Sequence, residues 1–382
     1  MGNSDSGFCI STFCAIATAA YVYTVVRQVT EGCYAGCWAI ALGTLGCPLY
    51  FWGCPGCCGL LLCCSLCLYY VTVGRRVEWL SMHGRAVLVT GCDSGFGHAL
   101  AKLLGELGVT VFAGVLDASG PGAQQLKEHG SKDLQVLQLD VTDHSQIEQA
   151  HRYICAQVGE DGLWGLVNNA GILGYTADGE IQPITAYRRC MDVNFLSAVK
   201  MCQVFLPLLR RSRGRIVNIS SMAGEMPIPM FSPYGASKAA LSIFSSALRL
   251  ELAGWGVKVA TIHPAGFRTS IFRSSEAGSR YQDKLLNSLS SDTREDYGEA
   301  YISSLLDCPS KMSDQLPDDL SPVLEDMRHA LLSVHPEPLY SPGQTAWLFP
   351  FLYHLCPTAV SDFIIPRLFK FTDSLPAGLR MN

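Results

Sequence analysis

Hydrophobic and polar residues follow two different patterns along the chain, and the change comes near Arg75. Residues 1–74 hold only three charged side chains, and residues 7–26 and 32–74 are two runs without any. About 20 apolar residues are enough for a helix to cross the hydrocarbon core of a bilayer. Because Pro55 interrupts the longer run with a turn signal, we predict three membrane-spanning helices, with two as the alternative count.

Beyond Arg85, short apolar runs alternate with segments of helical periodicity. The runs that we expect as strands are residues 86–90, 109–116, 134–139, 164–168, 215–220 and 257–263. The clearest expected helices are residues 99–107, 147–158, 187–210 and 236–252. This alternation indicates βαβ units. We therefore predict an α/β protein with a Rossmann-type doubly wound parallel sheet, preceded by N-terminal transmembrane helices.

Composition narrows the functional classes. The net charge is −5 and no basic block occurs, so nothing favours nucleic acid as a partner. Eleven of the 17 cysteines lie within the first 67 residues, in a stretch without histidine. Such cysteines suit membrane packing or palmitoylation better than zinc, and we expect no metal.

A glycine-rich turn follows the first expected strand. Gly91, Gly95 and Gly97 let the backbone turn tightly and approach a pyrophosphate at a helix N-terminus, although an ordinary strand-to-helix turn is the alternative. Asp117 comes 20 residues after Gly97, where a carboxylate binds the adenosine ribose or serves as a solvated turn residue. Since no Lys or Arg flanks Asp117, the sequence favours NAD over NADP.

A tyrosine and a lysine are spaced for acid–base chemistry. Tyr234 and Lys238 are four residues apart, so a helix places them on one face. The lysine charge is expected to lower the phenol pKa toward the working range, although such a pair alone can also be a surface contact. Ser221 follows an expected strand and supplies a hydroxyl that can meet Tyr234 over a cofactor.

Together with the Asn-Asn-Ala-Gly segment at 168–171 and Asn194, these motifs resemble the complete motif set of the classical short-chain dehydrogenases/reductases, over about residues 84–271. The resemblance implies catalytic roles for Asn194, Ser221, Tyr234 and Lys238. It implies NAD contacts for Gly91, Ser94, Gly95, Phe96, Gly97, Asp117, Asp140, Val141, Asn168, Ala170, Gly171, Tyr234, Lys238, Pro264, Gly266 and Thr269.

The resemblance also implies how these residues act. Tyr234 takes the hydroxyl proton, Ser221 holds the substrate oxygen, and the carbinol hydride passes to the nicotinamide. Asn194 continues the proton relay through water, unless its side chain only bonds the backbone. One departure is Ala265, which stands between the proline and the glycine that the family has adjacent, so the nicotinamide loop is expected to be stiffer or displaced.

Within the family, the uncharged leader and residues 163–174 are similar to membrane-bound 17β-hydroxysteroid dehydrogenases. This similarity implies oxidation of estradiol to estrone and of testosterone to androstenedione, with 11β-hydroxysteroid dehydrogenase or retinol dehydrogenase activity as the alternatives. Residues 226–231 and 271–289 are expected to line a mainly apolar steroid pocket. The aromatic tail 347–371 is either a second membrane contact near the entrance or a packed helix.

The expected organisation is a membrane anchor at 1–83, an NAD-binding domain at 84–271, and substrate loops with an apolar tail at 272–382. The expected partners are a steroid and the membrane, and a homodimer is an assembly that the family allows. Arg75, Arg76 and Arg85 directly follow the last span, so the positive-inside rule predicts a cytosolic catalytic domain at the endoplasmic reticulum membrane.

Overall fold

The computed structural model describes residues 78–129, 132–272, 285–305, 308–343, 345–372 and 374–380. The expected membrane spans and the N-terminal cysteine clusters lie outside these residues. From Trp79 onward the described chain forms one compact unit.

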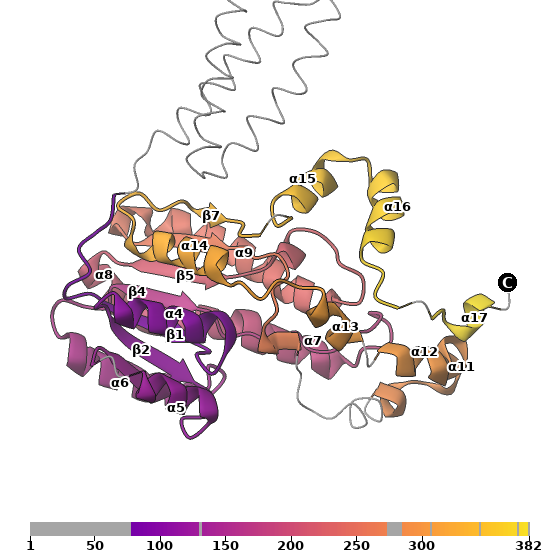
Figure 1. The fold of residues 1–382 in the computed structure, drawn as a ribbon, viewed down its shortest axis with the longest axis horizontal. Helices are drawn as coiled ribbons and strands as arrows, with labels where there is room; N and C mark the ends of the chain where they lie inside the picture. The colour runs from indigo at the N-terminus through magenta and orange to yellow at the C-terminus, as the bar shows by residue number, and fades with distance from the viewer. Residues whose placement is uncertain are drawn as a thin grey trace, which may run out of the picture. The chain divides into compact units, whose positions relative to one another are not determined.

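A seven-stranded parallel sheet forms the centre of this unit, with the strand order β3-β2-β1-β4-β5-β6-β7 (Figure 1). The strands are β1 (Ala86–Thr90), β2 (Thr110–Val115), β3 (Leu134–Gln138), β4 (Gly165–Asn168), β5 (Arg215–Ile219), β6 (Lys258–Ile262) and β7 (Leu339–Tyr340). The order reverses between β1 and β4, and such a reversal creates the crevice in which doubly wound folds bind ligands. The predicted fold class is therefore confirmed for the sheet.

The α-helices that follow β1, in chain order, are α4 (Gly95–Glu106), α5 (Pro121–Glu128), α6 (His144–Val158), α7 (Ile184–Met191), α8 (Ser197–Ser212), α9 (Ser232–Leu252), α11 (Ser291–Tyr297), α12 (Glu299–Ser304), α13 (Cys308–Asp314), α14 (Ser321–Leu332), α15 (Leu348–Leu355), α16 (Thr358–Leu368) and α17 (Ala377–Arg380). A π-helical turn, η1 (Asp192–Leu196), joins α7 to α8. Three 3₁₀ turns complete the described helices: η2 (Met222–Gly224), η3 (Ala253–Trp255) and η4 (Ser270–Phe272).

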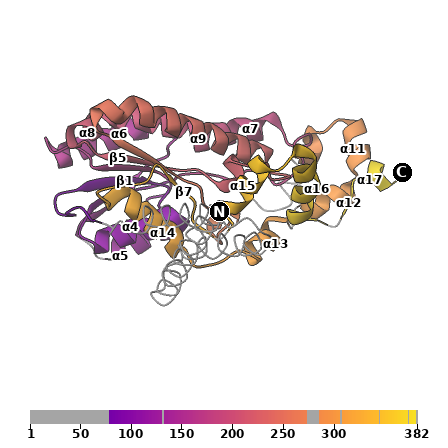
Figure 2. The ribbon, with the colours of Figure 1, turned by 90° about the horizontal axis from the view of Figure 1, so that it is seen from above.

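Helices cover both faces of the sheet, as Figure 2 shows from above. Alternate residues of β1 explain this arrangement, because Val87 and Val89 pack with α4, α5 and α14, whereas Leu88 packs with α6, α8 and α9. All five residues of β1 are buried. A strand that is buried on both faces gives a continuous hydrophobic run in the sequence, which is why β1 could be predicted.

Within the described residues, one helical stretch, Ile184–Ser212, is long and apolar enough to cross a membrane by length and composition. It consists of α7, η1 and α8. Phe205, Leu208 and Leu209 of α8 are buried in the core cluster beneath the sheet. We therefore interpret this stretch as a core element of the domain, with its apolar face directed at the sheet.

The tail contributes to the sheet itself. β7 pairs with the edge of β6, and the amide of His263 donates to the carbonyl of Tyr340 at 2.8 Å. α14 packs against the same face of the sheet as α4. Residues 272–382 therefore supply framework elements in addition to the loops and tail that the sequence indicates.

Candidate active site

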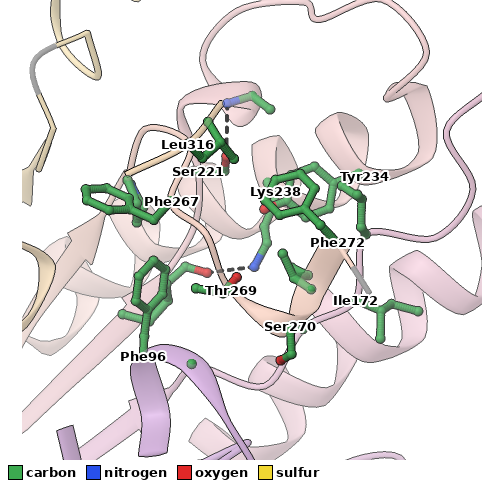
Figure 3. Close-up of a pocket in the computed structure, with 18 of the residues that line it drawn as sticks. Phe96, Ile172, Ser221, Tyr234, Lys238, Phe267, Thr269, Ser270, Phe272 and Leu316 are labelled. Atoms are coloured by element: carbon green, nitrogen blue, oxygen red, sulfur yellow. Dashed lines mark hydrogen bonds between the residues drawn. The ribbon is translucent and has the colours of Figure 1, made fainter. Parts of the chain in front are cut away.

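A cavity of about 1520 Å³ opens at the carboxyl ends of the parallel strands. This volume exceeds that of a usual pocket for one ligand, about 300–1,000 Å³, so the cavity has room for a dinucleotide and a substrate together. Fourteen predicted site residues line it: Gly91, Ser94, Gly95, Phe96, Asp140, Val141, Ala170, Gly171, Ser221, Tyr234, Lys238, Pro264, Gly266 and Thr269. Figure 3 shows Tyr234 and Lys238 on one side of it and Phe96 on the other.

Two glycines shape the turn between β1 and α4. Gly91 has a φ of 67°, and a Cβ atom there would lie 2.8 Å from the backbone of Ala170. Gly97 does not line the cavity, and a Cβ atom at Gly97 would lie 2.5 Å from the carbonyl oxygen of Gly91. The turn is therefore closed to side chains at both positions. Together with the N-terminus of α4 at the cavity wall, it fits the pyrophosphate of a dinucleotide.

Asn169 holds this turn in place, although the sequence did not single it out as a site residue. Its side-chain amide donates to the carbonyl oxygens of Thr90 at 2.8 Å and of Gly91 at 3.1 Å. The Thr90 hydroxyl accepts hydrogen bonds from the amides of Asn169 and Ala170, each at 3.0 Å. The only feature of the sequence that could have indicated a role for Asn169 was its position in the Asn-Asn pair at 168–169. Asn168, which was predicted, is instead buried outside the cavity wall and donates to Asn218 at 2.8 Å.

Asp117 lies in the exposed loop after β2, beside the cavity residue Leu116. Hydrogen bonds from Ser119 lower the pKa of its carboxyl group, so it is ionised at neutral pH. The loop is fixed by Asp93, which accepts from the amide of Leu116 at 2.9 Å and from that of Asp117 at 3.1 Å. Asp93 therefore positions the loop that carries Asp117, a role that was not predicted from the sequence.

One cation near Asp117 was also missed. Lys127 of α5 donates to the carbonyl of Ala118 at 2.9 Å. The expectation that no basic residue flanks Asp117 holds along the sequence, but the fold places this ammonium group beside the same loop.

The catalytic candidates meet where α9 begins. Tyr234 and Lys238 are both buried on one face of α9, and the Lys238 ammonium lies 5.7 Å from the centre of the tyrosine ring. Lys238 Nζ donates to the carbonyl of Ile219 at 2.7 Å. Ser221 caps η2, and its hydroxyl accepts from the amide of Ala223 at 3.1 Å. The predicted trio is thus brought together.

The direction of the Tyr234 pKa differs from the expectation. Burial raises the pKa of Tyr234 to about 12, although a hydrogen bond with Ser221 opposes the rise. Burial also lowers the pKa of Lys238 to about 8. The shared cause is desolvation, which disfavours whichever form is charged, and the expected lowering of the phenol pKa by Lys238 is not found.

Asn194 lies in the π turn η1 and does not line the cavity. Its side chain exchanges hydrogen bonds with the backbone of Ile172, at 2.8 Å and 2.9 Å, and donates to Ser237 at 2.9 Å. Ser237 in turn donates to the carbonyl of Tyr234 at 2.7 Å. Asn194 therefore braces the loop after β4 against the helix that carries Tyr234, as the backbone-bonding alternative anticipated.

The loop after β6 covers the glycine turn. Thr269 packs over Gly95, and the hydroxyl groups of Ser94 and Ser270 form a hydrogen bond. Ala265 donates from its amide to Pro342 at 3.0 Å, and its methyl group faces Gly343, where a Cβ atom would lie only 2.8 Å away. The inserted alanine is thus accommodated by a glycine of the tail.

The other half of the cavity is apolar. It is lined by Ile228, Phe231, Ile271, Phe272, Met312, Leu316, Phe349, Leu368, Phe369 and Phe371. Several come from the ranges that the sequence indicated, but Met312, Leu316 and the tail residues do not. A mainly apolar wall next to the Tyr234 hydroxyl suits a hydrophobic alcohol.

Comparisons with known proteins agree with this geometry. The sequence model described as short chain dehydrogenase matches residues 85–280. Mouse estradiol 17-beta-dehydrogenase 2 is 43% identical over 91% of this chain and 89% of its own length. Rabbit 11-beta-hydroxysteroid dehydrogenase type 2 is 42% identical over 77% of this chain and 74% of its own. For rat retinol dehydrogenase 16 the identity is 38%, over 77% of this chain and 90% of its own.

Among solved structures, a short-chain dehydrogenase from Streptomyces avermitilis is similar in fold, with a TM-score of 0.58 and 25% identity. The match covers 77% of this chain and all of that one. The chain therefore belongs to the short-chain dehydrogenase family. It is an oxidoreductase that acts on CH–OH groups with a nicotinamide cofactor.

Proposed function

We propose that the protein oxidises the 17β-hydroxyl group of steroids such as estradiol and testosterone, with NAD as the hydride acceptor. The observation that carries this proposal is the position of Tyr234. Its side chain lies beside Ser221, where the glycine-lined half of the cavity meets the apolar half. The similarity to a relative named for estradiol 17-beta-dehydrogenation supports the choice of substrate.

In this proposal the cofactor-binding set is the one predicted from the sequence, with Asp117 selecting NAD and without Asn168, which is buried against Asn218 outside the cavity wall. A carboxylate at the ribose accepts hydroxyl hydrogen bonds and repels a 2′-phosphate. Bound NAD would supply the hydride acceptor. Asp140, Val141 and Thr269 lie along the cavity wall, where they can contact the two ends of such a molecule.

Each catalytic candidate then has a separate task. Ser221 holds the substrate oxygen, and Tyr234 removes the hydroxyl proton as general base. Lys238 supplies positive charge that favours the phenolate, although desolvation limits this effect. Asn194 acts through position, since it fixes the loop at Ile172 against α9.

Membrane attachment belongs to the same proposal. Residues 1–83 would form the anchor segment, of which the residues from Trp79 onward already belong to the compact unit. Residues 84–271 would form the NAD-binding domain, and 272–382 the substrate loops and tail. The uncharged runs at 7–26 and 32–74 support the anchor, and the arginines after them support a cytosolic domain at the endoplasmic reticulum membrane. Protease added to sealed microsomes should digest the domain without detergent. Resistance until detergent is added would place it in the lumen.

The activity is tested with membranes from cells that express the full chain. Estradiol, testosterone, a corticosterone-type steroid and retinol are each offered with NAD and with NADP, and Tyr234→Phe membranes serve as the blank. We expect the highest kcat/KM for the 17β-hydroxysteroids with NAD. A higher value for the 11-hydroxysteroid or for retinol would assign the corresponding alternative. Chemical cross-linking of the same membranes tests for a homodimer.

A further inference from the structure

Two helices of the tail expose apolar side chains that a soluble protein normally covers. Large exposed hydrophobic residues concentrate on α15 and α16: Phe351, Leu352, Leu355, Val360, Phe363, Ile364 and Leu368. Leu355 is 68% exposed and Phe363 is 61% exposed. Contiguous exposed apolar surface of this kind usually marks a contact with a partner or a membrane. Figure 1 shows these helices in yellow.

Helix α16 is exposed at every position except Ser361 and Ile365, and its exposed positions carry large apolar side chains beside Asp362 and Arg367. Its outward stripe holds Val360, Phe363, Ile364 and Leu368, which occupy the helical positions i, i+3, i+4 and i+8. The side that faces the protein buries Ser361 together with Ile365. A small polar residue inside and an apolar stripe outside indicate that the outward environment is itself apolar.

The exposed stripe is continuous with the cavity. Leu368 is 56% exposed and also lines the cavity, as do its neighbour Phe369 and, from α15, Phe349. On the inner side, Ile365 packs with Met222, the residue after Ser221. The same helix therefore borders the solvent, the cavity mouth and the turn that carries the substrate-binding hydroxyl.

We propose that the outer surface of α15 and α16 lies in the acyl-chain region of a lipid bilayer, so that the apolar substrate enters the cavity from the membrane past Leu368. The proposal rests on the proposed function for the substrate and for the N-terminal anchor. It adds a second, separate membrane contact.

The charges of this surface favour lipid over a protein partner. Residues 348–368 contain only two charged side chains, Asp362 and Arg367. The guanidinium group of Arg367 lies 3.6 Å from the centre of the Phe363 ring, so it borders the apolar stripe. An arginine in this position can bury its stem among acyl chains and keep its charge at the phosphates. Trp347, whose ring centre lies 6.5 Å from that of the exposed Phe351, adds an aromatic ring of the type found at bilayer interfaces.

The first test maps lipid contacts without requiring turnover. The full-length protein is placed in nanodiscs whose phosphatidylcholine carries a photoactivatable diazirine in the acyl chain, and labelled peptides are identified by mass spectrometry. We expect label in the anchor and in residues 348–368. Peptides with Ile243 and Leu250, which are exposed apolar residues of α9, should remain unlabelled and serve as the matched control.

Each outcome is informative. Label in the anchor alone would overturn the proposal, and so would a cross-link from α15 or α16 to a second copy of the chain in place of lipid. Absence of label in the anchor would instead contradict the anchoring part of the proposed function. The labelling result does not depend on which alcohol the enzyme oxidises. A wrong substrate assignment can therefore be told apart from a wrong assignment of the lipid contact.

The second test separates an effect on substrate entry from an effect on the chemical step. Leu355→Ser with Phe363→Ser makes the stripe polar without touching a cavity residue. We expect the KM for the preferred apolar alcohol to rise about three- to tenfold while kcat stays within twofold, because entry changes and the reacting groups do not. The control pair Ile243→Ser with Leu250→Ser should leave KM within twofold. An unchanged KM in the first pair, with protein levels and membrane attachment preserved, would refute entry along this surface.

Discussion

His263 should make the stability of the folded domain depend on pH. This histidine is buried at the end of β6, where Nδ1 lies 3.3 Å from Glu225 Oε1 and Nε2 lies 3.1 Å from the Ser242 hydroxyl. Burial lowers the pKa of His263 to about 4, and the charge of Lys238 acts in the same direction. The imidazole is thus neutral in the fold and bridges the turn after Ser221 to helix α9.

The size of the effect follows from the two pKa values. Between about pH 6.5, the pKa of an exposed histidine, and pH 4, the unfolded chain binds a proton that the fold does not. Stability is therefore lost as the pH falls, by up to about 3 kcal/mol at the acid end and by ~1.3 kcal/mol between pH 7.5 and 5.5. The Glu225 carboxylate would stabilise a protonated imidazole, so both figures are upper limits. In a domain of this size ~1.3 kcal/mol corresponds to about 2–4 °C in Tm.

The assay is thermal unfolding of the full-length protein in detergent, at pH 7.5 and pH 5.5, for the wild type and for His263→Gln. The amide keeps a donor and an acceptor but does not titrate. We expect the wild type to lose about 2–4 °C more than the variant on acidification, since other histidines titrate equally in both. Glu225→Gln should enlarge the loss. Equal losses in wild type and His263→Gln would refute the reasoning, and a smaller loss in the wild type would mean that Glu225 keeps the imidazole charged.

Four further outcomes are expected of the site. Tyr234→Phe should lower kcat by about 10²–10⁴-fold because it removes the general base, with NAD binding by calorimetry changed less than threefold; turnover within tenfold of wild type would contradict the role. Since Tyr234 must lose a proton and Lys238 must keep one, kcat/KM for oxidation should rise with pH up to about 8 and then level off, and a plateau reached below pH 7 would be inconsistent with these pKa values. Asp117→Ala with Ala118→Arg should shift the kcat/KM ratio at least tenfold toward NADP, and equal use of both cofactors by the wild type would show that Asp117 does not select NAD. Asn194→Ala should lower both Tm and kcat because it leaves the backbone groups of Ile172 unpaired, and Asn194→Asp should not restore either, because a carboxylate cannot donate to the Ile172 carbonyl; a kcat and Tm unchanged in Asn194→Ala would argue against the positioning role.

The strands of the sheet were predictable where apolar residues follow one another in the sequence. Six strands lie where the sequence indicated them. Five of them are buried almost throughout, whereas the edge strand β3 is only partly buried. β7 was missed, since it has only two residues, which are too few to show a strand pattern. The π turn at Asp192–Leu196 was missed as well, because its periodicity differs from that of an α-helix over too few residues to be seen.

Site residues close to a strand end were also predictable, but their interactions were not. The sequence placed Tyr234, Lys238 and Ser221 together, yet it could not show that burial raises the phenol pKa and lowers that of the ammonium group. Lys127 was overlooked for a similar reason. It lies ten residues beyond Asp117 in the chain, and only the turn into α5 returns its side chain to the loop.

The two halves of the cavity differ in how their positions are determined. The dinucleotide half is built from turns that directly follow β1, β4 and β6, so local motifs specify it. The substrate half depends on contacts between distant segments, such as the stacking of Phe231 on Phe371 with ring centres 5.8 Å apart and the hydrogen bond from Tyr301 to Asp178. Substitutions in the tail can therefore reshape the pocket without disturbing the proton-transfer residues. This separation directs any search for specificity determinants to the walls formed by α13, α15 and α16.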